Sequence, residues 1–338
     1  MILATFFDKQ GSLRLGAVRR DREAVVDLQA VYRASSGGRD APALCTMQAL
    51  IEAGGEGLAL AAEMEHKAGS DATWGAPLAS TRLAAPLPVP TQMRDFSTFE
   101  MHMRQAAVGM ARLRSARHGT GPEAVPRASD IVLPEAFAHQ PLYYKTNRFS
   151  VVGHEHEVEW PSYCERFDYE LEFGAILGRG GRDISAATAR DHIFGYTIFN
   201  DFSARDAQEY EMTGPLGPTK GKDFDTGNVL GPWVVTADEL PDPYALRMSA
   251  RVNGEIWSDG NSRDMVHSFE DMIAHVSRDE TLYPGEFLGS GTVGGGCGLE
   301  LDRWLEPGDV VELEVEGIGV LRNRVVRRKG SAPAFSPG

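Results

Sequence analysis

The stretch "RFDYELEFGAIL", Arg166 to Leu177, decides the fold because it joins paired acids to a continuous apolar run. Side chains of an extended segment alternate, so Glu170 and Glu172 share one face of a strand. From Phe173 to Leu177 both faces are apolar, which predicts a strand covered on both sides. Two ionised carboxylates entering such a strand would repel each other and take up protons unless a positive partner holds them. A bound cation is the simplest such partner, and a solvated strand face is the alternative that the stretch alone leaves open.

The composition limits the classes of function. The chain has 338 residues, 42% of them hydrophobic, and a net charge of −14, which argues against nucleic acid or an anionic membrane as a partner. No apolar run is long enough to span a membrane, and the first residues lack the basic start of a signal peptide. The 3 cysteines form no CxxC pair, as is typical of a reducing compartment. We expect a cytoplasmic protein that binds neither nucleic acid nor an anionic membrane.

The distribution of strand-like runs, with 37 glycines and 19 prolines, predicts a β-rich α+β fold. We expect a large mixed β roll or sandwich preceded by a small β domain. Helices are predicted within residues 46–68 and 97–119, the second stopping at Gly119, and Asn253-Gly254 predicts a hairpin. The expected divisions are 1–85 for the small N-terminal β domain, 86–92 for a proline-rich linker, 93–330 for the large domain and 331–338 for a flexible tail.

Further residues whose side chains could bind a ligand or take part in a reaction lie just before or after the strand-like runs. Asp201 follows the apolar run "IFGYTIF", at an end where its side chain can reach into a site. Lys222 lies in a glycine-rich loop whose backbone can pass close to a ligand. The remaining candidates at this level are Asp95, His102, Arg205, Gln208, Thr226 and Glu300.

These motifs, taken in order, resemble the fumarylacetoacetate hydrolase family over residues from about 93 to 325. "DYELEFGAILGRGGRDIS" is similar to the family's D-Y-E-x-E strand, and "NDFSARDAQ" looks like its N-D-x-[ST]-A-R-D-x-Q signature. "GKDFDT", "VNG" and "SGT" followed by a late Glu also fit. The seven-residue spacing from Asp95 to His102 resembles the full-length fumarylacetoacetase-like branch. In long members of this family the N-terminal domain is SH3-like.

The resemblance implies a set of roles. It implies four metal ligands, all of which offer oxygen. Oxygen ligands favour a hard cation, Mg²⁺ first, with Mn²⁺ or Ca²⁺ as alternatives. His102 would deprotonate water with Glu300 orienting its ring, and Arg205, Gln208 and Lys222 would bind substrate oxygens and complete the catalytic set. The implied metal ligands are Asp95, Glu170, Glu172 and Asp201, and the implied substrate or supporting residues are Thr226, Thr292 and Arg112.

The implied activity is metal-dependent hydrolysis of the carbon–carbon bond of a small-molecule substrate, a β-diketo acid or acylpyruvate, in the breakdown of aromatic compounds. The metal would stabilise the departing enolate. The alternative within the family is a lyase or isomerase of a 2-oxo acid, such as an oxaloacetate decarboxylase or a 2-oxo-enoate hydratase. A reading from another class is a non-catalytic oligomeric binding module. The family also implies a homodimer.

Other notable side chains have simpler interpretations. His154 and His156 share a strand face, but no third nitrogen or sulfur ligand lies nearby, so a pocket-lining loop or a solvated edge is the expectation. Arg114 and Arg117 are expected on a solvated helix face. Met212 stands roughly where the fumarylacetoacetase branch has a substrate-contacting tyrosine, which argues against a strictly fumaryl-specific substrate.

Overall fold

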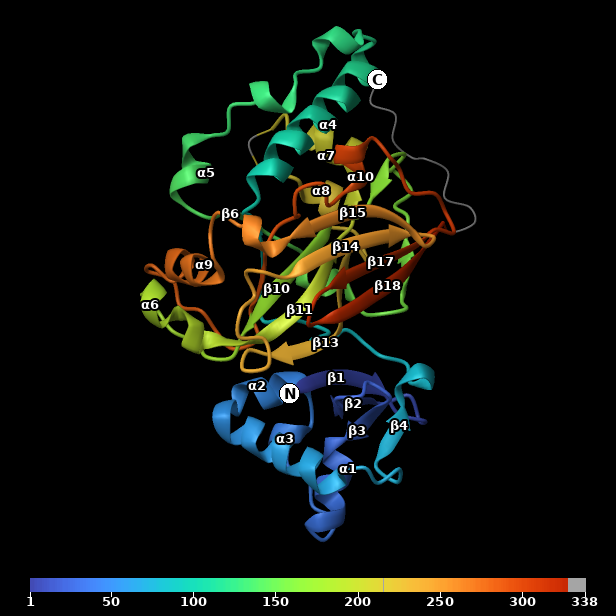
Figure 1. Ribbon diagram of the computed structural model, residues 1–338, viewed down its shortest axis with the longest axis vertical. Helices are drawn as coiled ribbons and strands as arrows, with labels where there is room; N and C mark the ends of the chain where they lie inside the picture. The colour runs from blue at the N-terminus through green and yellow to red at the C-terminus, as the bar shows by residue number, and fades with distance from the viewer. Residues whose placement is uncertain (215, 328–338) are drawn as a thin grey trace.

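The computed structural model describes residues 1–214 and 216–327, so the tail expected at 331–338 lies outside the described residues. Figure 1 shows two packed β-sheets with helices around them and a separate lobe, drawn in blue, that contains the N-terminus. The large sheet has the strand order β4-β3-β2-β1-β13-β11-β10-β16-β5-β6, with β7 paired to β13. Its strands are β1 Ile2–Phe7, β2 Leu13–Val18, β3 Ala24–Asp27, β4 Gly75–Pro77, β5 Met93–Ser97, β6 Leu142–Lys145, β7 Val151–Val152, β10 Leu171–Leu177, β11 Ile193–Asp201, β13 Asn228–Thr236 and β16 Phe287–Gly289.

Strand β10 lies between β11 and β16 in the large sheet. All of its residues are buried, which confirms the predicted strand covered on both faces. Such a strand needs apolar side chains toward both layers, and Phe173 to Leu177 supply them. Glu172 is therefore carried into the interior by the strand that forms the centre of the fold.

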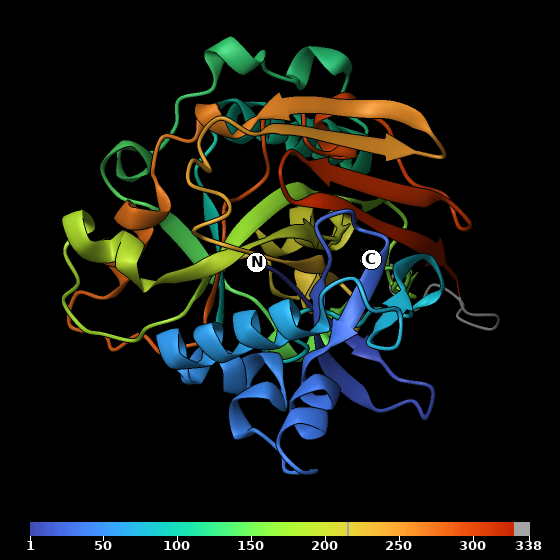
Figure 2. The same cartoon turned by 60° about the horizontal axis from the view of Figure 1, so that its bottom comes forward.

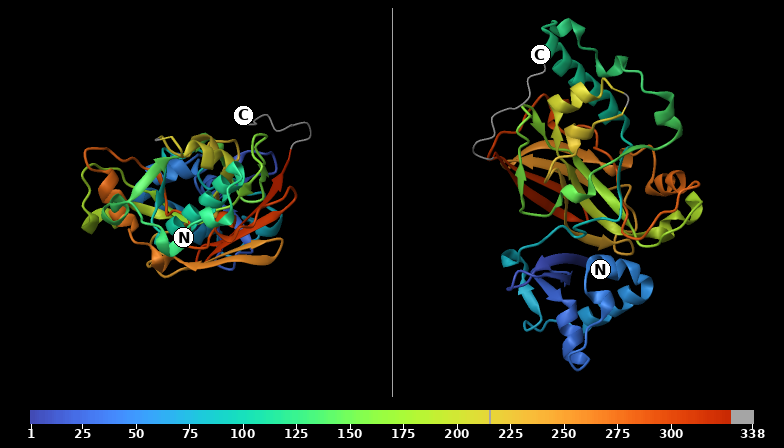
Figure 3. Two further views of the ribbon diagram at one scale, coloured as in Figure 1. Left: turned by 90° about the horizontal axis from the view of Figure 1, so that it is seen from above. Right: turned by 180° about the vertical axis from the view of Figure 1, so that it is seen from behind.

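The second sheet packs against strands β10, β11 and β13 of the first, so the two share one hydrophobic core. Its hairpin turns at Asn253 and Gly254, whose φ angles of 52° and 83° confirm the predicted Asn-Gly turn. Figure 3 shows this sheet from above and from behind. The strands of the second sheet are β8 Glu157–Glu159, β14 Arg247–Val252, β15 Glu255–Asn261, β17 Val310–Val315 and β18 Gly319–Val326, and a separate ribbon pairs β9 Phe167–Asp168 with β12 Ser203–Ala204.

The helices of the large domain are mostly short, apart from α4, which ends as predicted. Gly119 follows its last residue in the left-handed conformation, with φ 66°, where glycine carries no steric cost. Helix α9 begins after Ser268 in a capping box with Asp271. These helices are α4 Glu100–His118, α5 Glu135–His139, α6 Ala186–Ala189, α7 Arg205–Glu211, α8 Thr219–Lys222, α9 Phe269–Val276 and α10 Gly298–Leu301.

The N-terminal lobe combines strands β1 to β4 with three helices (Figures 1 and 2). The expected separate SH3-like barrel is not shown, because β1 continues into the large sheet by pairing Ile2 with Val235 and Leu3 with Val234. The predicted interrupted helix within 46–68 is confirmed as two helices. Residues 86–92 contain neither helix nor strand, and the domain limits themselves stay predictions. The helices of this lobe are α1 Leu28–Ser35, α2 Met47–Glu52 and α3 Gly54–Ala68.

Within the described ranges 1–214 and 216–327, the structure contains no helix long and apolar enough to cross a membrane.

Candidate active site

The order β11-β10-β16-β5 brings together acids that are far apart in the sequence. Asp95 on β5 lies opposite Gly289 of β16, and Glu172 on β10 lies opposite Phe199 of β11. Asp201 ends β11 on the same part of the sheet. The side chains of these acids converge because adjacent strands lie about 4.8 Å apart.

Three of these acids have buried oxygens that find no hydrogen-bond donor in the described chain when the acids are ionised. Asp95 and Glu172 can share a hydrogen bond only when one of them is protonated. Asp95, Glu172 and Asp201 each contribute one carboxylate oxygen to a group in which the three oxygens lie within 4.8 Å of one another. Asp95 Oδ1, Glu172 Oε2 and Asp201 Oδ1 are buried and have no hydrogen-bond partner. Leaving a buried charged oxygen unpaired is costly, so the arrangement fits a cation that supplies the missing partner. An all-oxygen set suits a hard divalent ion such as Mg²⁺, Mn²⁺ or Ca²⁺.

Glu170 lies beside this group, but its oxygens contact cations of the chain. Oε2 is 2.5 Å from Nζ of Lys222, and Oε1 is 2.7 Å from Nη2 of Arg205. Each carboxylate oxygen has two lone pairs, so these contacts leave Glu170 able to reach an ion as well. The structure thus brings the four predicted ligands together and presents unpaired oxygens on three of them, and the ligand role of Glu170 stays a prediction.

The local charge balance favours a divalent ion. Asp168 joins the four acids in this region, against the two cations Arg205 and Lys222. Burial, together with the charge of Asp201, raises the pKa of Asp95 to about 8. Burial raises the pKa of Asp201 to about 6 and that of Glu172 well above its usual range. Without an ion, these carboxylates therefore hold their protons to higher pH than usual.

These shifts predict a pH-dependent effect of metal on stability. Because Asp95 and Asp201 hold protons in the folded state up to pH values near 8 and 6, and release them near about 4 when unfolded, the metal-free protein should lose stability as pH rises from about 4 to 8. Bound Mg²⁺ replaces those protons, so the gain in Tm from Mg²⁺ over EDTA should grow between pH 6 and pH 8. Melting curves across this range test it, and a gain that stays flat or shrinks contradicts it.

Gly289 leaves the room that Asp95 needs. A Cβ at this position would lie 2.5 Å from Asp95 Oδ1, one of the three unpaired oxygens, and 3.3 Å from Phe199. A methyl group there would push the carboxylate out of the group that it forms with Glu172 and Asp201. The glycine therefore belongs to the construction of the metal site.

We expect Gly289→Ala to weaken Mg²⁺ binding by about tenfold, the effect usual for changes just outside the ligands. Isothermal titration with Mg²⁺ measures it. Gly55→Ala, where a Cβ meets nothing within 4 Å, is the matched control and should leave the affinity unchanged. Equal affinities in the two variants would contradict the spatial role of Gly289.

Polar neighbours fix the orientation of the acids. Tyr144 on β6 donates its hydroxyl to Asp201 Oδ2 at 2.5 Å, and Lys222 Nζ lies 2.7 Å from the same oxygen. Thr292 Oγ1 donates to Glu172 Oε1 at 3.0 Å. Each contact uses one oxygen and leaves the other toward the centre of the group. Sequence reasoning missed Tyr144, because an isolated "LYYK" strand carries no signal for this contact.

The guanidinium group of Arg205 contacts three side chains of the protein itself. Its Nε donates to Asp168 Oδ2 at 2.8 Å and its Nη1 to Gln208 Oε1 at 2.8 Å, in addition to the ion pair with Glu170. Asp168 also accepts from the backbone N–H groups of Gly298 and Leu299. Arg205 of α7 and Asp168 of β9 therefore join α7, β9 and α10. Asp168 was not singled out as a site residue, although it opens the "DYE" motif.

His102 and Glu300 form the predicted pair. Nδ1 of His102 on α4 lies 2.7 Å from Glu300 Oε1 on α10, across 198 residues of sequence. The other oxygen, Oε2, accepts from the backbone N–H of Gly295 at 2.7 Å, which holds the carboxylate in place. If Nδ1 carries the proton donated to Glu300, Nε2 is left with a lone pair that can accept a proton. The His102 side chain is 12% exposed, so the ring remains partly accessible to solvent while Glu300 is buried.

The remaining predicted residues have no described contact with the carboxylates. The Thr226 hydroxyl accepts from the backbone N–H of Glu159. Arg112 is half-buried on α4 with Nη1 unpartnered, and its substrate role stays a prediction. Arg114 and Arg117 are exposed, in keeping with the expected solvated face, and both also pair with the buried Glu209, which ties α4 to α7.

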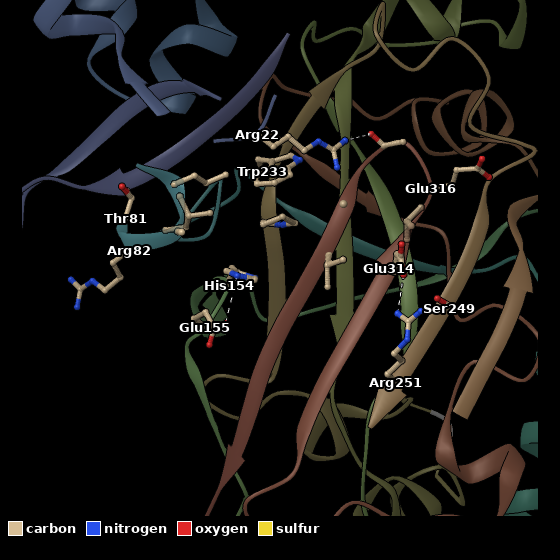
Figure 4. Close-up of a pocket in the computed structure, with 18 of the residues that line it drawn as sticks. Arg22, Thr81, Arg82, His154, Glu155, Trp233, Ser249, Arg251, Glu314 and Glu316 are labelled. Atoms are coloured by element: carbon tan, nitrogen blue, oxygen red, sulfur yellow. Dashed lines mark hydrogen bonds and ion pairs between the residues drawn. The ribbon is translucent and has the colours of Figure 1, made fainter. Parts of the chain in front are cut away.

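A cleft of about 830 Å³ lies away from these residues, between the N-terminal lobe and the second sheet. Figure 4 shows Arg22 beside Trp233 and Arg251 paired with Glu314. His154 lines this cleft, in keeping with the pocket-lining alternative from the sequence. None of the predicted site residues lines this cleft. The buried carboxylates therefore identify the candidate site better than the size of the cleft does.

A model of a known protein family matches the larger part of the chain. The model for the fumarylacetoacetate hydrolase C-terminal family covers residues 116–326, the part that contains Glu170, Glu172, Asp201 and Glu300. Among curated proteins, the human mitochondrial oxaloacetate tautomerase FAHD2A is 39% identical over 188 residues, which are 55% of this chain and 59% of that protein. The match thus spans about three fifths of that relative's length.

Similar solved structures cover nearly the whole chain, and they include two hydrolases. A fumarylacetoacetate hydrolase from Exiguobacterium antarcticum superimposes with a TM-score of 0.72 and 26% identity, covering 97% of this chain and 100% of that one. A maleylpyruvate hydrolase from a Sphingobium species, solved in complex with manganese(II) and pyruvate, gives a TM-score of 0.69, 25% identity and the same coverage. The manganese in that complex indicates a divalent metal in this group of proteins.

Proposed function

The chain belongs to the fumarylacetoacetate hydrolase family, and we propose that it hydrolyses the carbon–carbon bond of an acylpyruvate or related β-diketo acid with the help of a divalent metal. The observation that carries this proposal is the His102–Glu300 pair at 2.7 Å beside the buried acids. Hydrolysis needs a base that activates water, and imidazole held by a carboxylate is well suited to that task. The named similarity to a maleylpyruvate hydrolase supports the substrate class.

The chain's own residues supply the proton transfers. Glu300 fixes the ring of His102, whose Nε2 takes a proton from water as the oxygen attacks the substrate carbonyl. The carbon–carbon bond then breaks, its electron pair leaves as an enolate, and His102 returns the proton to the enolate carbon. The water oxygen ends in the released carboxylic acid, so atoms and charge balance.

A cationic group of the chain lies close to where negative charge develops. Lys222 is buried between Glu170 and Asp201, and attraction to these carboxylates outweighs burial and raises the pKa of Lys222 above its usual range. A fixed ammonium group in a buried site stabilises developing oxyanion charge. When bound at Asp95, Glu172 and Asp201, and at Glu170 where it reaches, a divalent cation would supply Lewis-acid stabilisation of the enolate.

We propose Mg²⁺ as the working ion, with Mn²⁺ or Ca²⁺ able to replace it, because the donor set is all oxygen. A homodimer in the cytoplasm and a place in aromatic breakdown also remain proposals.

The second candidate is an isomerase of a 2-oxo acid, favoured by the 39% identity to an oxaloacetate tautomerase. Keto–enol exchange moves a proton without breaking a carbon–carbon bond, so it needs a base but no attack by water. The proton-transfer part of the site would serve both reactions.

The experiment that separates them supplies substrates of both kinds to purified protein with Mg²⁺. Maleylpyruvate, fumarylpyruvate and fumarylacetoacetate test hydrolysis, through loss of diketone absorbance together with release of the carboxylic acid product. Oxaloacetate tests tautomerisation, through enol absorbance without loss of the compound, and decarboxylation, through release of CO₂. Turnover of oxaloacetate enol alone, with every diketo acid left intact, would overturn the hydrolase proposal in favour of the isomerase.

A further inference from the structure

Cys297 is a buried residue that the proposed reaction does not use. It directly precedes α10, and its Sγ donates to Glu300 Oε1 at 3.4 Å. The same oxygen lies 2.7 Å from Nδ1 of His102. A sulfur and a nitrogen from distant parts of the chain therefore meet at one carboxylate oxygen. Each contact serves as a hydrogen bond in the metal-free protein, and together the three atoms form a compact donor set.

The geometry of this set suits a small tetrahedral ion. The three donor atoms of His102, Cys297 and Glu300 lie within 4.8 Å of one another. Zinc bonds of about 2.0–2.3 Å in a tetrahedron place neighbouring ligands roughly 3.3–3.8 Å apart. The Cys297–Glu300 separation of 3.4 Å already matches, and the His102–Glu300 separation of 2.7 Å needs to open by under about 1 Å. The fourth position would remain for water.

The chemistry of the donors separates this set from the nearby acids. Asp95, Glu172 and Asp201 offer only oxygen, which hard ions prefer, whereas sulfur and imidazole select Zn²⁺ and other thiophilic ions. Glu300 is held in place by the N–H of Gly295, so one ligand is fixed before an ion arrives. A bound ion must displace the thiol proton, because the thiolate is the metal ligand.

We propose that His102, Cys297 and Glu300 form a second metal site, selective for Zn²⁺ and similar thiophilic cations, and that its occupation inhibits the enzyme. An ion at this site takes Glu300 Oε1 away from the imidazole and binds the imidazole itself. His102 can then no longer act as the base that activates water. The chain thus has a hard-ion site that supports activity and a thiophilic site that blocks it. The inhibition rests on the proposed function, whereas the binding does not.

Co²⁺ is the probe for binding, because a cobalt–thiolate bond produces a charge-transfer band in the near ultraviolet. Co²⁺ is titrated into the full-length protein saturated with Mg²⁺. We expect a band that saturates at one ion per chain, disappears in Cys297→Ser, and persists in Cys45→Ser, which removes the exposed thiol. A protein without the band, or a band that survives Cys297→Ser, would overturn the site.

A second variant keeps the test decisive if Cys297→Ser folds poorly. His102→Gln retains the thiol and should weaken Co²⁺ binding by at least about tenfold, the size of effect that even outer-shell changes produce. Glu172→Gln removes a ligand of the hard site and should leave the band intact. Unchanged Co²⁺ affinity in His102→Gln would exclude the imidazole as a ligand and overturn the three-ligand site.

Inhibition is measured separately, with Zn²⁺ added to the Mg²⁺-saturated enzyme acting on its best substrate. The Zn²⁺ concentration for half inhibition should rise at least about tenfold in Cys297→Ser relative to wild type. Equal sensitivity of the two proteins would overturn the inhibitory role. If no diketo acid is turned over at all, the proposed function fails, and the cobalt band still decides the site.

Discussion

Replacing His102 with glutamine should lower kcat for diketo-acid hydrolysis by about 10²–10⁴-fold, the usual contribution of a positioned general base. Glutamine keeps a polar side chain near Glu300 but cannot take a proton from water. KM and Mg²⁺ affinity should change little, because His102 contacts Glu300 and none of the three acids with unpaired oxygens. Steady-state kinetics with Mg²⁺ titration measure all three quantities.

Glu300→Gln is the companion variant. It leaves the base in place but replaces the carboxylate that holds it, so its loss in kcat should be smaller. The double variant should be little worse than His102→Gln alone, because the two residues act as one unit. Full hydrolysis in His102→Gln would remove the water-activating role, and would favour the isomerase if oxaloacetate tautomerisation persisted.

Replacing Glu172 with glutamine should weaken Mg²⁺ binding by at least about 100-fold, beyond the 10–100-fold typical of changes outside the ligands. Glu172 is fully buried and its Oε2 has no partner, so its charge is available to an ion. The same variant should raise Tm in EDTA at pH 8. Burial and the neighbouring acids raise the pKa of Glu172, so at pH 8 the metal-free fold must either hold a proton that the unfolded chain has released or carry an unfavourable charge, and glutamine removes this cost.

The test is specific because the variant should raise Tm in EDTA while it lowers Mg²⁺ affinity. A variant that merely damages the fold would lower Tm with and without metal, whereas Glu172→Gln should gain in EDTA and no longer respond to Mg²⁺. Glu157→Gln, on an exposed position of β8, is the matched control and should change neither Tm nor Mg²⁺ affinity. Unchanged Mg²⁺ affinity in Glu172→Gln would count against the whole metal-site assignment.

Local patterns were sufficient to predict much of the fold. The apolar run from Phe173 to Leu177 predicted a strand buried on both faces, and Gly119 and Asn253-Gly254 marked a helix end and a hairpin. These signals are strong because each depends on the conformation of a few neighbouring residues. The ordered motifs then indicated the family, which the family comparison confirms.

Contacts between distant segments could not be predicted in the same way. Tyr144 reaches Asp201 only because β6 and β5 follow β16 and β10 in the sheet, an order that the sequence does not state. The joining of β1 to β13 depends on two residue pairs, and nothing in "ILATFF" distinguishes a partner within the first 85 residues from one beyond them. Charged helix faces are equally ambiguous, as the pairing of Arg114 with buried Glu209 shows.

The pairing of β1 with β13 gives the N-terminal lobe a part in protecting the rest of the molecule. Val234 and Val235 belong to the strand next to the one that ends in Asp201, and β1 covers their backbone groups. Removing the lobe would expose hydrogen-bonding edge and apolar surface there, a combination that invites self-association. A shortened protein that keeps every proposed ligand is therefore expected to aggregate, and the two parts should melt together in a single cooperative transition.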